Sequence, residues 1–379
     1  MKSVGVLHVV GTRPNFMKVA PLMRAIEVHN RLSSDSVTFR QRLVHTGQHY
    51  SPEMSAVFFD ELGLPEPDSY LDVGPGSHAV QTAALMVALE ADLLASRPDL
   101  VCVVGDVNST LAAALVASKL HIPVAHIESG LRSGDRQMPE EINRILTDRL
   151  AQILFTTSEA ASRRLEAEGV PSAWTHFVGN TMIDCLEDCL PIARKRMPAV
   201  QRQLEAREYA LLTLHRPSNV DDPEQLQALI EVVTRVSQRL PVVFPAHLRT
   251  RGRLEACGAL QALERNESVV LTPPLGYLGF VSLLSGARLA MTDSGGIQAE
   301  ACVLGTPCVT LRTTTEWTET LEAGSNVLAD PYSQSAIEEA VEDCLRRRPP
   351  TAGFRPERWD GHASARVVSA MVDWATDGL

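Results

Sequence analysis

The sequence predicts an α/β protein built from two Rossmann-like domains. Short runs rich in valine and leucine recur along both halves of the chain, and each is followed by a polar turn and an amphipathic stretch. At least 15 residues separate successive runs within each half, which leaves room for a helix to cross over between parallel strands. A length of 379 residues also fits two domains better than one.

The expected strands can be given in chain order. In the first half they are Val4–Val10, Gln41–His45, Leu100–Val104, Val124–Ile127 and Ile153–Thr157. In the second half they are Tyr209–Leu214, Val242–Pro245, Val269–Thr272, Leu289–Thr292 and Cys308–Leu311. We expect one domain junction between Gly169 and Asn180 and a second near 346–350, followed by a last helix in 362–379. The domains are therefore expected to be 1–173 and 174–361.

The amino-acid composition argues against several classes of function. The net charge of −11 argues against a general binder of nucleic acid or of anionic membranes. The 7 cysteines include no C-x-x-C pair, so we interpret them as reduced core thiols. The N-terminus lacks the cleavage pattern of a signal peptide, and no apolar run approaches the ~20 residues of a membrane span. A cytoplasmic location is predicted.

Polar residues concentrate in the turns after the strands of the first half, where open α/β sheets bind ligands. Arg13 and Lys18 surround a turn that enters a helix, and they are either phosphate ligands or ordinary solvated charges. Asp106 could act on a substrate or cap a helix. Glu128 directly ends a buried-looking strand, where an unpaired carboxylate would be costly, so a functional role is favoured.

The second half repeats this arrangement. His215 ends a strand and is a candidate general acid or base, although a lone histidine is more often structural. The turn 292–296 combines a strand end, the pair Gly295-Gly296 and a helix N-terminus, which together suit a pyrophosphate. Glu300 could reach ribose hydroxyls. The alternative is a helix start that needs glycine only to pack on its strand.

Several familiar motifs are absent or weak. The stretch 74–79 fits a loose G-x-G-x-x-A pattern, but Pro75 would sit inside the tight turn, so we reject a nicotinamide cofactor. The sequence has no P-loop, no G-x-S-x-G elbow and no H-E-x-x-H helix. Neither a metal nor an organic cofactor is required.

Taken in order, the strand-end turns resemble the non-hydrolysing UDP-N-acetylglucosamine 2-epimerase family across nearly the whole chain. The motifs that carry this resemblance are Gly11-Thr12-Arg13-Pro14, His45-Thr46-Gly47-Gln48-His49, Gly105-Asp106, His126-Ile127-Glu128-Ser129-Gly130-Leu131-Arg132-Ser133, Met138-Pro139-Glu140-Glu141-Ile142-Asn143-Arg144, Thr213-Leu214-His215-Arg216, Pro274-Leu275-Gly276-Tyr277, Thr292-Asp293-Ser294-Gly295-Gly296 and Glu322-Ala323-Gly324. The resemblance implies a GT-B-type fold, with two Rossmann-like domains facing a cleft and residues 362–379 crossing back onto the first domain. It also implies a homodimer.

The implied reaction is reversible inversion at carbon 2 of a UDP-2-acetamido sugar, most simply UDP-N-acetylglucosamine to UDP-N-acetylmannosamine. UDP would be eliminated to give a 2-acetamidoglucal and added again after a proton returns to the opposite face, with no cofactor. Carried over by motif, the catalytic residues are Asp106, Glu128, Glu140 and His215. The residues that would hold the UDP-sugar are Arg13, Lys18, Arg132, Ser294, Gly295, Gly296 and Glu300. Gln48 and Arg216 match the site where bacterial members bind a second UDP-N-acetylglucosamine as an activator.

Departures from the family pattern leave the sugar open. Asn15 stands where the family usually has glutamate, and Trp317 stands where it usually has arginine. A modified UDP-hexosamine, such as a diacetamido or uronic derivative, is therefore an alternative substrate. A hydrolysing 2-epimerase that releases free sugar and UDP is another alternative. A GT-B glycosyltransferase would not explain three carboxylates in first-half turns, and a regulator without catalysis would not explain why all four catalytic residues are retained.

Overall fold

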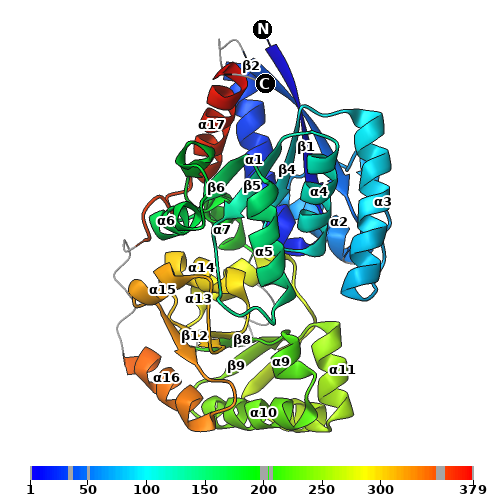
Figure 1. Ribbon diagram of the computed structural model, residues 1–379. Helices are drawn as coiled ribbons and strands as arrows, with labels where there is room; N and C mark the ends of the chain where they lie inside the picture. Colours follow the sequence, from blue (N-terminus) through cyan, green and yellow to red (C-terminus); the bar gives the residue numbers. More distant parts are fainter. Residues whose placement is uncertain are drawn as a thin grey trace. The chain divides into compact units, whose positions relative to one another are not determined.

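The computed structural model describes residues 2–32, 37–48, 52–196, 204, 208–346 and 355–377. The chain forms two compact units (Figure 1). Unit 1 comprises Met1–Glu187 and Glu357–Leu379, and unit 2 comprises Asp188–Pro356. The expected second junction near 346–350 falls mainly on residues outside those described.

Unit 1 is a parallel sheet covered by helices on both faces. Its strands among the described residues are β1 (Lys2–Val10), β2 (Val37–His45), β3 (Ser69–Tyr70), β4 (Leu100–Val104), β5 (Val124–Ser129), β6 (Ile153–Thr156) and β7 (Thr175–Phe177). They pair in the order β3-β2-β1-β4-β5-β6-β7. Its helices are α1 (Arg13–Leu32), α2 (Pro52–Leu62), α3 (His78–Ser96), α4 (Asn108–Lys119), α5 (Pro139–Leu150), α6 (Glu159–Ala167), the start of α7 (Thr181–Ala193) and α17 (Ala363–Asp377).

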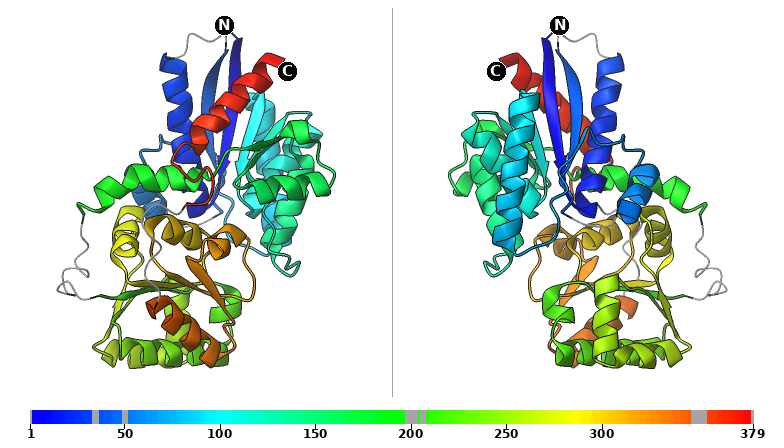
Figure 2. Two further views of the ribbon diagram at one scale, coloured as in Figure 1. Left: turned by 90° about the vertical axis from the view of Figure 1, so that its left-hand side faces the viewer. Right: turned by 90° about the vertical axis from the view of Figure 1, so that its right-hand side faces the viewer.

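Packing in unit 1 follows the sequence pattern. Leu85, Leu89 and Leu93 recur at helical spacing on α3 and are buried together with the central strands. Alanines at 112–114 and 117 let α4 approach the sheet closely. The other face carries α1 and α17, which lie side by side (Figure 2). The strands β4, β5 and β6 are therefore buried on both sides, as their continuous apolar runs predict.

The C-terminal helix returns to the first unit, as the resemblance implies. The Asp184 carboxylate accepts hydrogen bonds from the backbone N–H groups of Ala363, at 3.1 Å, and Ser364, at 2.6 Å, at the start of α17. At the other end of α17, Lys2 Nζ donates to the carbonyl of Ala375 at 2.8 Å. Trp359 is fully buried just before the helix, and its indole N–H donates to the carbonyl of Thr157 at 2.9 Å.

Unit 2 repeats the architecture with a smaller parallel sheet. Its described strands are β8 (Ala210–Thr213), β9 (Val242–Pro245), β10 (Val269–Thr272), β11 (Leu289–Thr292), β12 (Cys308–Leu311) and β13 (Asn326–Ala329), in the order β10-β9-β8-β11-β12-β13. Its helices are α9 (Pro217–Val220), α10 (Pro223–Ser237), α11 (Leu248–Ala256), α12 (Ala259–Arg265), α13 (Tyr277–Gly286), α14 (Gly295–Leu304), α15 (Thr318–Glu322) and α16 (Gln334–Arg346). One apolar cluster joins the sheet to α10 and α16, and a second joins it to α13 and α14.

Two expectations about chain organisation need correction. Residues 175–177 form β7, which pairs with β6, so the first unit continues past 173 into α7. Likewise, the chain returns to unit 1 at Glu357 rather than at 362.

One described helix, α3, is long and apolar enough to cross a membrane, contrary to the expectation of no such run. Three of its leucines, Leu85, Leu89 and Leu93, are buried in the core of unit 1, so this helix packs against the sheet.

Candidate active site

In each sheet the winding direction changes at one point, and candidate residues of that unit lie in the turns beside it. In unit 1 the chain adds β2 and β3 on one side of β1, and β5 to β7 beyond β4 on the other. In unit 2 the corresponding pair is β8 and β11. Parallel sheets bind ligands outside the carboxyl ends of the strands at such a switch. The turns that follow these four strands begin at Gly11, Gly105, Leu214 and Asp293.

Asn15 closes the turn after β1. Its side-chain oxygen accepts hydrogen bonds from the backbone N–H groups of Gly11, at 3.1 Å, and Thr12, at 3.0 Å. Its side-chain nitrogen donates to the carbonyl of Val104, the last residue of β4, at 3.2 Å. A glutamate carboxylate could not make this last bond, because it has no N–H to donate. The departure from the family pattern at this position therefore ties the ends of β1 and β4 together.

A buried ion pair lies between the turn after β1 and the end of β5. Lys18 Nζ lies 2.6 Å from Glu128 Oε1, and both side chains are almost fully buried. Gly105 leaves room for this contact, because an added Cβ would lie 3.1 Å from Lys18 Nζ. Lys18 therefore compensates the charge of Glu128, and its predicted role as a nucleotide ligand stays a prediction.

Glu128 combines backbone strain with an unusual electrostatic setting. Its φ of +69° lies in the left-handed region, where a non-glycine residue costs about 1–3 kcal/mol. The pairing of β5 with β6 shifts register at this residue, which turns the side chain out of the normal alternation. Its Oε2 is buried and has no hydrogen-bond partner among the described residues. Burial raises the pKa of the Glu128 carboxyl, and Lys18 offsets only part of that effect.

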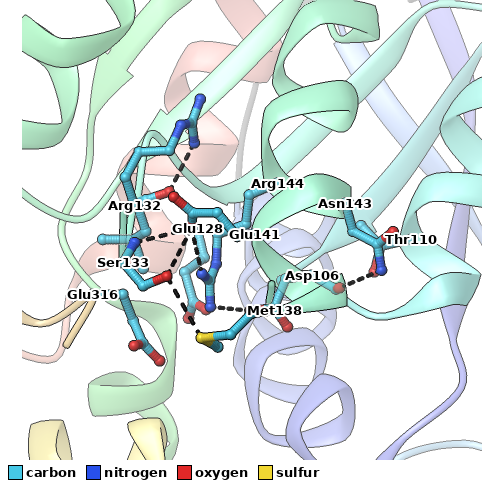
Figure 3. Close-up of polar contacts among 12 residues, drawn as sticks. Asp106, Thr110, Glu128, Arg132, Ser133, Met138, Glu141, Asn143, Arg144 and Glu316 are labelled. Carbon is cyan, nitrogen blue, oxygen red and sulfur yellow. Dashed lines mark hydrogen bonds and ion pairs between the residues drawn. The ribbon is translucent and has the colours of Figure 1, made fainter. Parts of the chain in front are cut away.

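Asp106 has a different environment. Its Oδ2 accepts a hydrogen bond from Arg144 Nη2 at 2.5 Å (Figure 3). Its backbone carbonyl accepts one from Asn143 Nδ2 at 2.8 Å. Arg144 and Asn143 both lie on the buried face of α5. The neighbouring carboxylates Asp106 and Glu128 thus differ, because one is paired with a guanidinium and the other retains a bare buried oxygen.

Glu141, rather than Glu140, carries the contacts at the start of α5. The carboxylate of Glu141 accepts the backbone N–H groups of Ser133, at 2.9 Å, and Gly134, at 3.0 Å. It also pairs with Arg144 at 2.9 Å. Burial raises the pKa of Glu141, but these hydrogen bonds and the guanidinium outweigh it and lower the pKa overall. Glu140 is half-buried in the first turn of the helix, and its catalytic role stays a prediction.

Arg132 is held by two carboxylates of unit 1. Its guanidinium forms two hydrogen bonds with Glu168, at 3.1 and 2.8 Å, and one with Asp148, at 2.7 Å. A further bond runs to the carbonyl of Leu131 at 2.7 Å. This arrangement anchors the loop after β5, so the contacts give no support to the expected role of Arg132 in binding the UDP-sugar.

In unit 2, Asp293 organises the turn that carries His215. Its carboxylate lies 2.8 Å from His215 Nδ1 and accepts the backbone N–H groups of His215 and Arg216 and the side-chain amide of Asn219. Burial raises the pKa of Asp293, but the His215 imidazole and these donors outweigh it and lower the pKa overall. The His215 side chain is 51% exposed. Asp293 therefore fixes the ring through Nδ1 and leaves Nε2 to exchange a proton with a ligand.

The first turn of α14 has the expected form. Ser294 makes no side-chain cap, and Ser294, Gly295 and Gly296 are half-buried. An added Cβ at Gly295 would lie 2.4 Å from Glu316 Oε1, so the backbone needs glycine there. Glu300 is buried in the same helix, and its Oε1 accepts a hydrogen bond from the Tyr277 hydroxyl at 2.8 Å.

The remaining expected ligands have partners of their own. Gln48 Oε1 accepts hydrogen bonds from the N–H and hydroxyl of Ser109, at 3.1 and 2.7 Å. The Arg13 guanidinium lies over the ring of Phe58, 5.4 Å from its centroid. Arg216 Nε donates to the carbonyl of Asp293 at 2.9 Å. The predicted roles of Gln48 and Arg216 at an activator site, and of Arg13 at a phosphate, stay predictions.

Sequence reasoning assigned no role to the buried partners Asp148, Arg144 and Asp293. Asp293 directly follows the strand β11, and a carboxylate at a strand end was a usable signal. Asp148 and Arg144 share one face of α5 at a spacing of four, but polar residues at that spacing usually mark a solvated face. Within the described residues, no group of three or more histidine, cysteine, aspartate or glutamate side chains could hold a metal ion.

Comparisons with known proteins identify the family. A family model described as UDP-N-acetylglucosamine 2-epimerase matches residues 30–372. The UDP-N-acetylglucosamine 2-epimerase of Methanocaldococcus jannaschii is 41% identical over 96% of this chain and 98% of that protein. The UDP-2,3-diacetamido-2,3-dideoxy-D-glucuronate 2-epimerase of Pseudomonas aeruginosa is 40% identical over 88% of this chain and 91% of that protein. The crystal structure of the M. jannaschii enzyme with UDP-GlcNAc and UDP has a TM-score of 0.88 at 39% identity and covers 99% of this chain and 100% of its own.

Proposed function

The chain belongs to the UDP-N-acetylglucosamine 2-epimerase family, and we propose that it interconverts UDP-N-acetylglucosamine and UDP-N-acetylmannosamine by elimination and re-addition of UDP. As a member it is an isomerase that acts on a UDP-sugar. A carboxylate takes the proton from carbon 2, the bond between carbon 1 and the UDP oxygen breaks, and a 2-acetamidoglucal forms. A second carboxyl group then returns a proton to the other face of carbon 2, and UDP adds again to carbon 1.

The contrast between Asp106 and Glu128 carries this proposal. Inversion by this route needs one carboxylate ready to accept a proton and one carboxyl group ready to give one. Pairs of titratable groups with contrasting environments are the usual source of such roles. Asp106 is paired with Arg144, which suits the base, whereas the buried Glu128, with its raised pKa, suits the acid. The two roles exchange when the reaction runs in reverse.

We assign departure and return of UDP to residues of unit 2. The Nε2 nitrogen of His215 can protonate the leaving diphosphate, because Asp293 holds the ring through Nδ1. The helix N-terminus at Gly295 and Gly296 suits the negative charge that develops on that diphosphate. Glu300, fixed by Tyr277, is then the group for the ribose hydroxyls.

The deciding experiment is proton NMR of the protein with UDP-N-acetylglucosamine in deuterium oxide. We expect UDP-N-acetylmannosamine that carries deuterium at carbon 2. Free N-acetylmannosamine with UDP would identify a hydrolysing enzyme instead. A matched trial with UDP-2,3-diacetamido-2,3-dideoxy-D-glucuronate tests the second substrate, because a 40% identical relative is a 2-epimerase of that sugar. Turnover of this compound alone would overturn the assignment of the sugar.

We also propose that the enzyme is a homodimer that pairs through α3. A stripe on the outward face of this helix is apolar, with the exposed Glu90 at its edge: Val80 is 64% exposed, Val87 is 72% exposed and Leu94 is 53% exposed. Exposed alanines at 84 and 91 lie between them, so a second helix could pack closely. Contiguous exposed apolar surface of this kind marks an interaction site, and a two-fold axis across one helix face buries it in both copies.

The oligomeric state tests this surface. We expect light scattering after size exclusion to give a dimer for the wild type and a monomer for Val87→Glu, because the new charge would be buried without a partner. Val57→Glu, at an exposed valine on α2, is the matched control and should remain dimeric. A dimer that survives Val87→Glu would place the interface elsewhere.

A further inference from the structure

His126 and Asp148 form a fully buried pair beneath the two loops that carry Asp106 and Glu128. His126 lies in β5, and its Nδ1 is 2.7 Å from Asp148 Oδ1. Its Nε2 is 2.8 Å from the carbonyl oxygen of Gly105, the residue before Asp106. Both side chains are at most 1% exposed. The pair touches neither reacting group directly, so its contribution must act through the backbone.

Counting donors and acceptors assigns the protons of this pair. A backbone carbonyl can only accept a hydrogen bond, so His126 Nε2 carries a proton. An ionised carboxylate also only accepts, so His126 Nδ1 carries one as well whenever Asp148 is charged. Asp148 Oδ2 accepts hydrogen bonds from the Arg132 guanidinium, at 2.7 Å, and from the backbone N–H of Gly130, at 3.1 Å, and both contacts favour the ionised carboxylate independently of His126. His126 is then an imidazolium with both N–H groups used.

The surrounding charges balance this arrangement. Asp148 Oδ2 pairs with Arg132 at 2.7 Å, and Arg132 pairs in turn with Glu168 at 2.8 Å. Two cations and two carboxylates therefore alternate in one connected group. A buried charge is costly without such a partner, and each of these charges has one.

The same carboxylate also holds the loop after β5. Asp148 Oδ2 accepts the backbone N–H of Gly130 at 3.1 Å. Gly130 has a φ of +77°, and an added Cβ would lie 2.7 Å from the carbonyl of Ala161, so its position is tightly set. Glu128 lies between His126 and Gly130, and its strained backbone is therefore held on both sides by groups bound to Asp148.

We propose that the charged pair His126–Asp148 is the positioning element that sets the backbone of both proton-transfer residues, Asp106 through the Gly105 carbonyl and Glu128 through Gly130. The proposal rests on the proposed function for its kinetic consequence, but its structural content does not. His126 and Asp148 are positioning residues rather than catalytic ones, because they touch neither substrate nor reacting atoms. Removing their charge should loosen both loops at once.

The substitution Asp148→Asn separates charge from shape. The new amide could donate to a neutral His126 at Nδ1 and accept from Gly130, so the number of hydrogen bonds is kept while the ion pair is lost. With ¹⁵N-labelled histidine, NMR of the wild type at neutral pH should show both ring nitrogens of His126 protonated. Asp148→Asn should show one bare nitrogen, and a His126→Gln sample identifies the signals. A bare ring nitrogen in the wild type would overturn the charged pair.

Two further readouts test positioning. Hydrogen exchange by mass spectrometry should become faster in peptides that cover 104–107 and 127–131 in Asp148→Asn, while α4 stays protected. A loop shift of about 1 Å costs roughly 100-fold in rate, so kcat should fall by 10- to 100-fold while KM stays within about 3-fold. The control is His8→Gln, which changes another fully buried histidine of the same sheet.

The outcomes separate this proposal from the proposed function. A wild-type protein that does not turn over UDP-N-acetylglucosamine would defeat the proposed function, whereas the NMR and exchange measurements would still test the pair. If Asp148→Asn leaves exchange in both loops and kcat unchanged, the positioning role is wrong. If His8→Gln lowers kcat equally at equal loss of stability, the effect is one of general stability and the proposal also fails.

Discussion

Removing the counterion of Glu128 should move the pH dependence of the reaction in a direction that the structure fixes. Lys18 Nζ lies 2.6 Å from Glu128 Oε1, and both groups are buried. In Lys18→Met the carboxylate would keep its burial but lose the charge that favours ionisation. The pKa of Glu128, already raised in the wild type, should therefore rise further.

The size of the shift follows from the cost of a broken buried pair. Removing one partner of such a pair costs about 3–5 kcal/mol while the other stays charged. At 1.36 kcal/mol per unit, the lower figure corresponds to about two pH units. The folding stability of Lys18→Met should also depend on pH, because the pKa of Glu128 in the folded protein lies above its value in the unfolded chain. The variant should lose stability as the pH rises above ~4.5, and the loss should grow until Glu128 ionises in the folded protein.

The assay is the profile of kcat/KM against pH in both directions, since this ratio reports the ionisation of the free enzyme. Where Glu128 acts as the base, the acidic limb should move to higher pH by about two units. Where it acts as the acid, the basic limb should move to higher pH instead. Lys119→Met removes the same charge from an exposed lysine at the end of α4 and should leave both limbs in place. Profiles of Lys18→Met that superimpose on the wild type would refute the reasoning.

Two further predictions concern stability and nucleotide binding. Burial lowers the pKa of His8 to about 4 from 6.5, so as the pH falls the unfolded chain binds the proton before the folded protein does. About 3 kcal/mol of folding stability should therefore be lost between pH 6.5 and 4. Urea unfolding of His8→Gln should show a smaller loss of stability over this pH range, and an equal loss would contradict the role of His8. Gly295→Ala would place a Cβ 2.4 Å from Glu316 Oε1, so calorimetry should show UDP binding weakened at least 10-fold. Gly279→Ala, whose nearest neighbour would be 3.8 Å away, should bind UDP normally, and equal affinities for the two variants would refute the close approach.

The sheets were largely predictable because their central strands are continuous apolar runs. Leu100–Val104 and Val242–Pro245 are strands residue for residue, as expected. The short edge strands β3, β7 and β13 were missed. Ser69–Tyr70 and Thr175–Phe177 carry too few apolar residues to stand out, and they become strands only because a neighbour supplies the hydrogen-bonding edge.

The candidate site was predictable in position but not in pairing. Strand-end turns indicated Asp106, Glu128 and His215 as candidates because ligands bind at strand ends in this type of fold, and their roles stay predictions. A sequence does not show which way a long side chain runs, however. Lys18 and Arg132 were interpreted as ligands for the UDP-sugar, whereas the structure pairs Lys18 with Glu128, and Arg132 with Asp148 and Glu168. These contacts join residues from different elements, so no local pattern could reveal them.

The pairing of the carboxylates explains which of them can carry a proton. Asp148 and Asp293 each use both oxygens for cations or N–H groups, and Glu141 does the same, so the pKa of each is lowered. Glu128 is buried as deeply, yet it has one cation and one oxygen without a partner among the described residues. Burial then outweighs attraction, and its pKa rises. Among these four carboxylates, Glu128 is therefore the one whose environment favours the protonated form, which fits the role that we propose for it in the inversion at carbon 2.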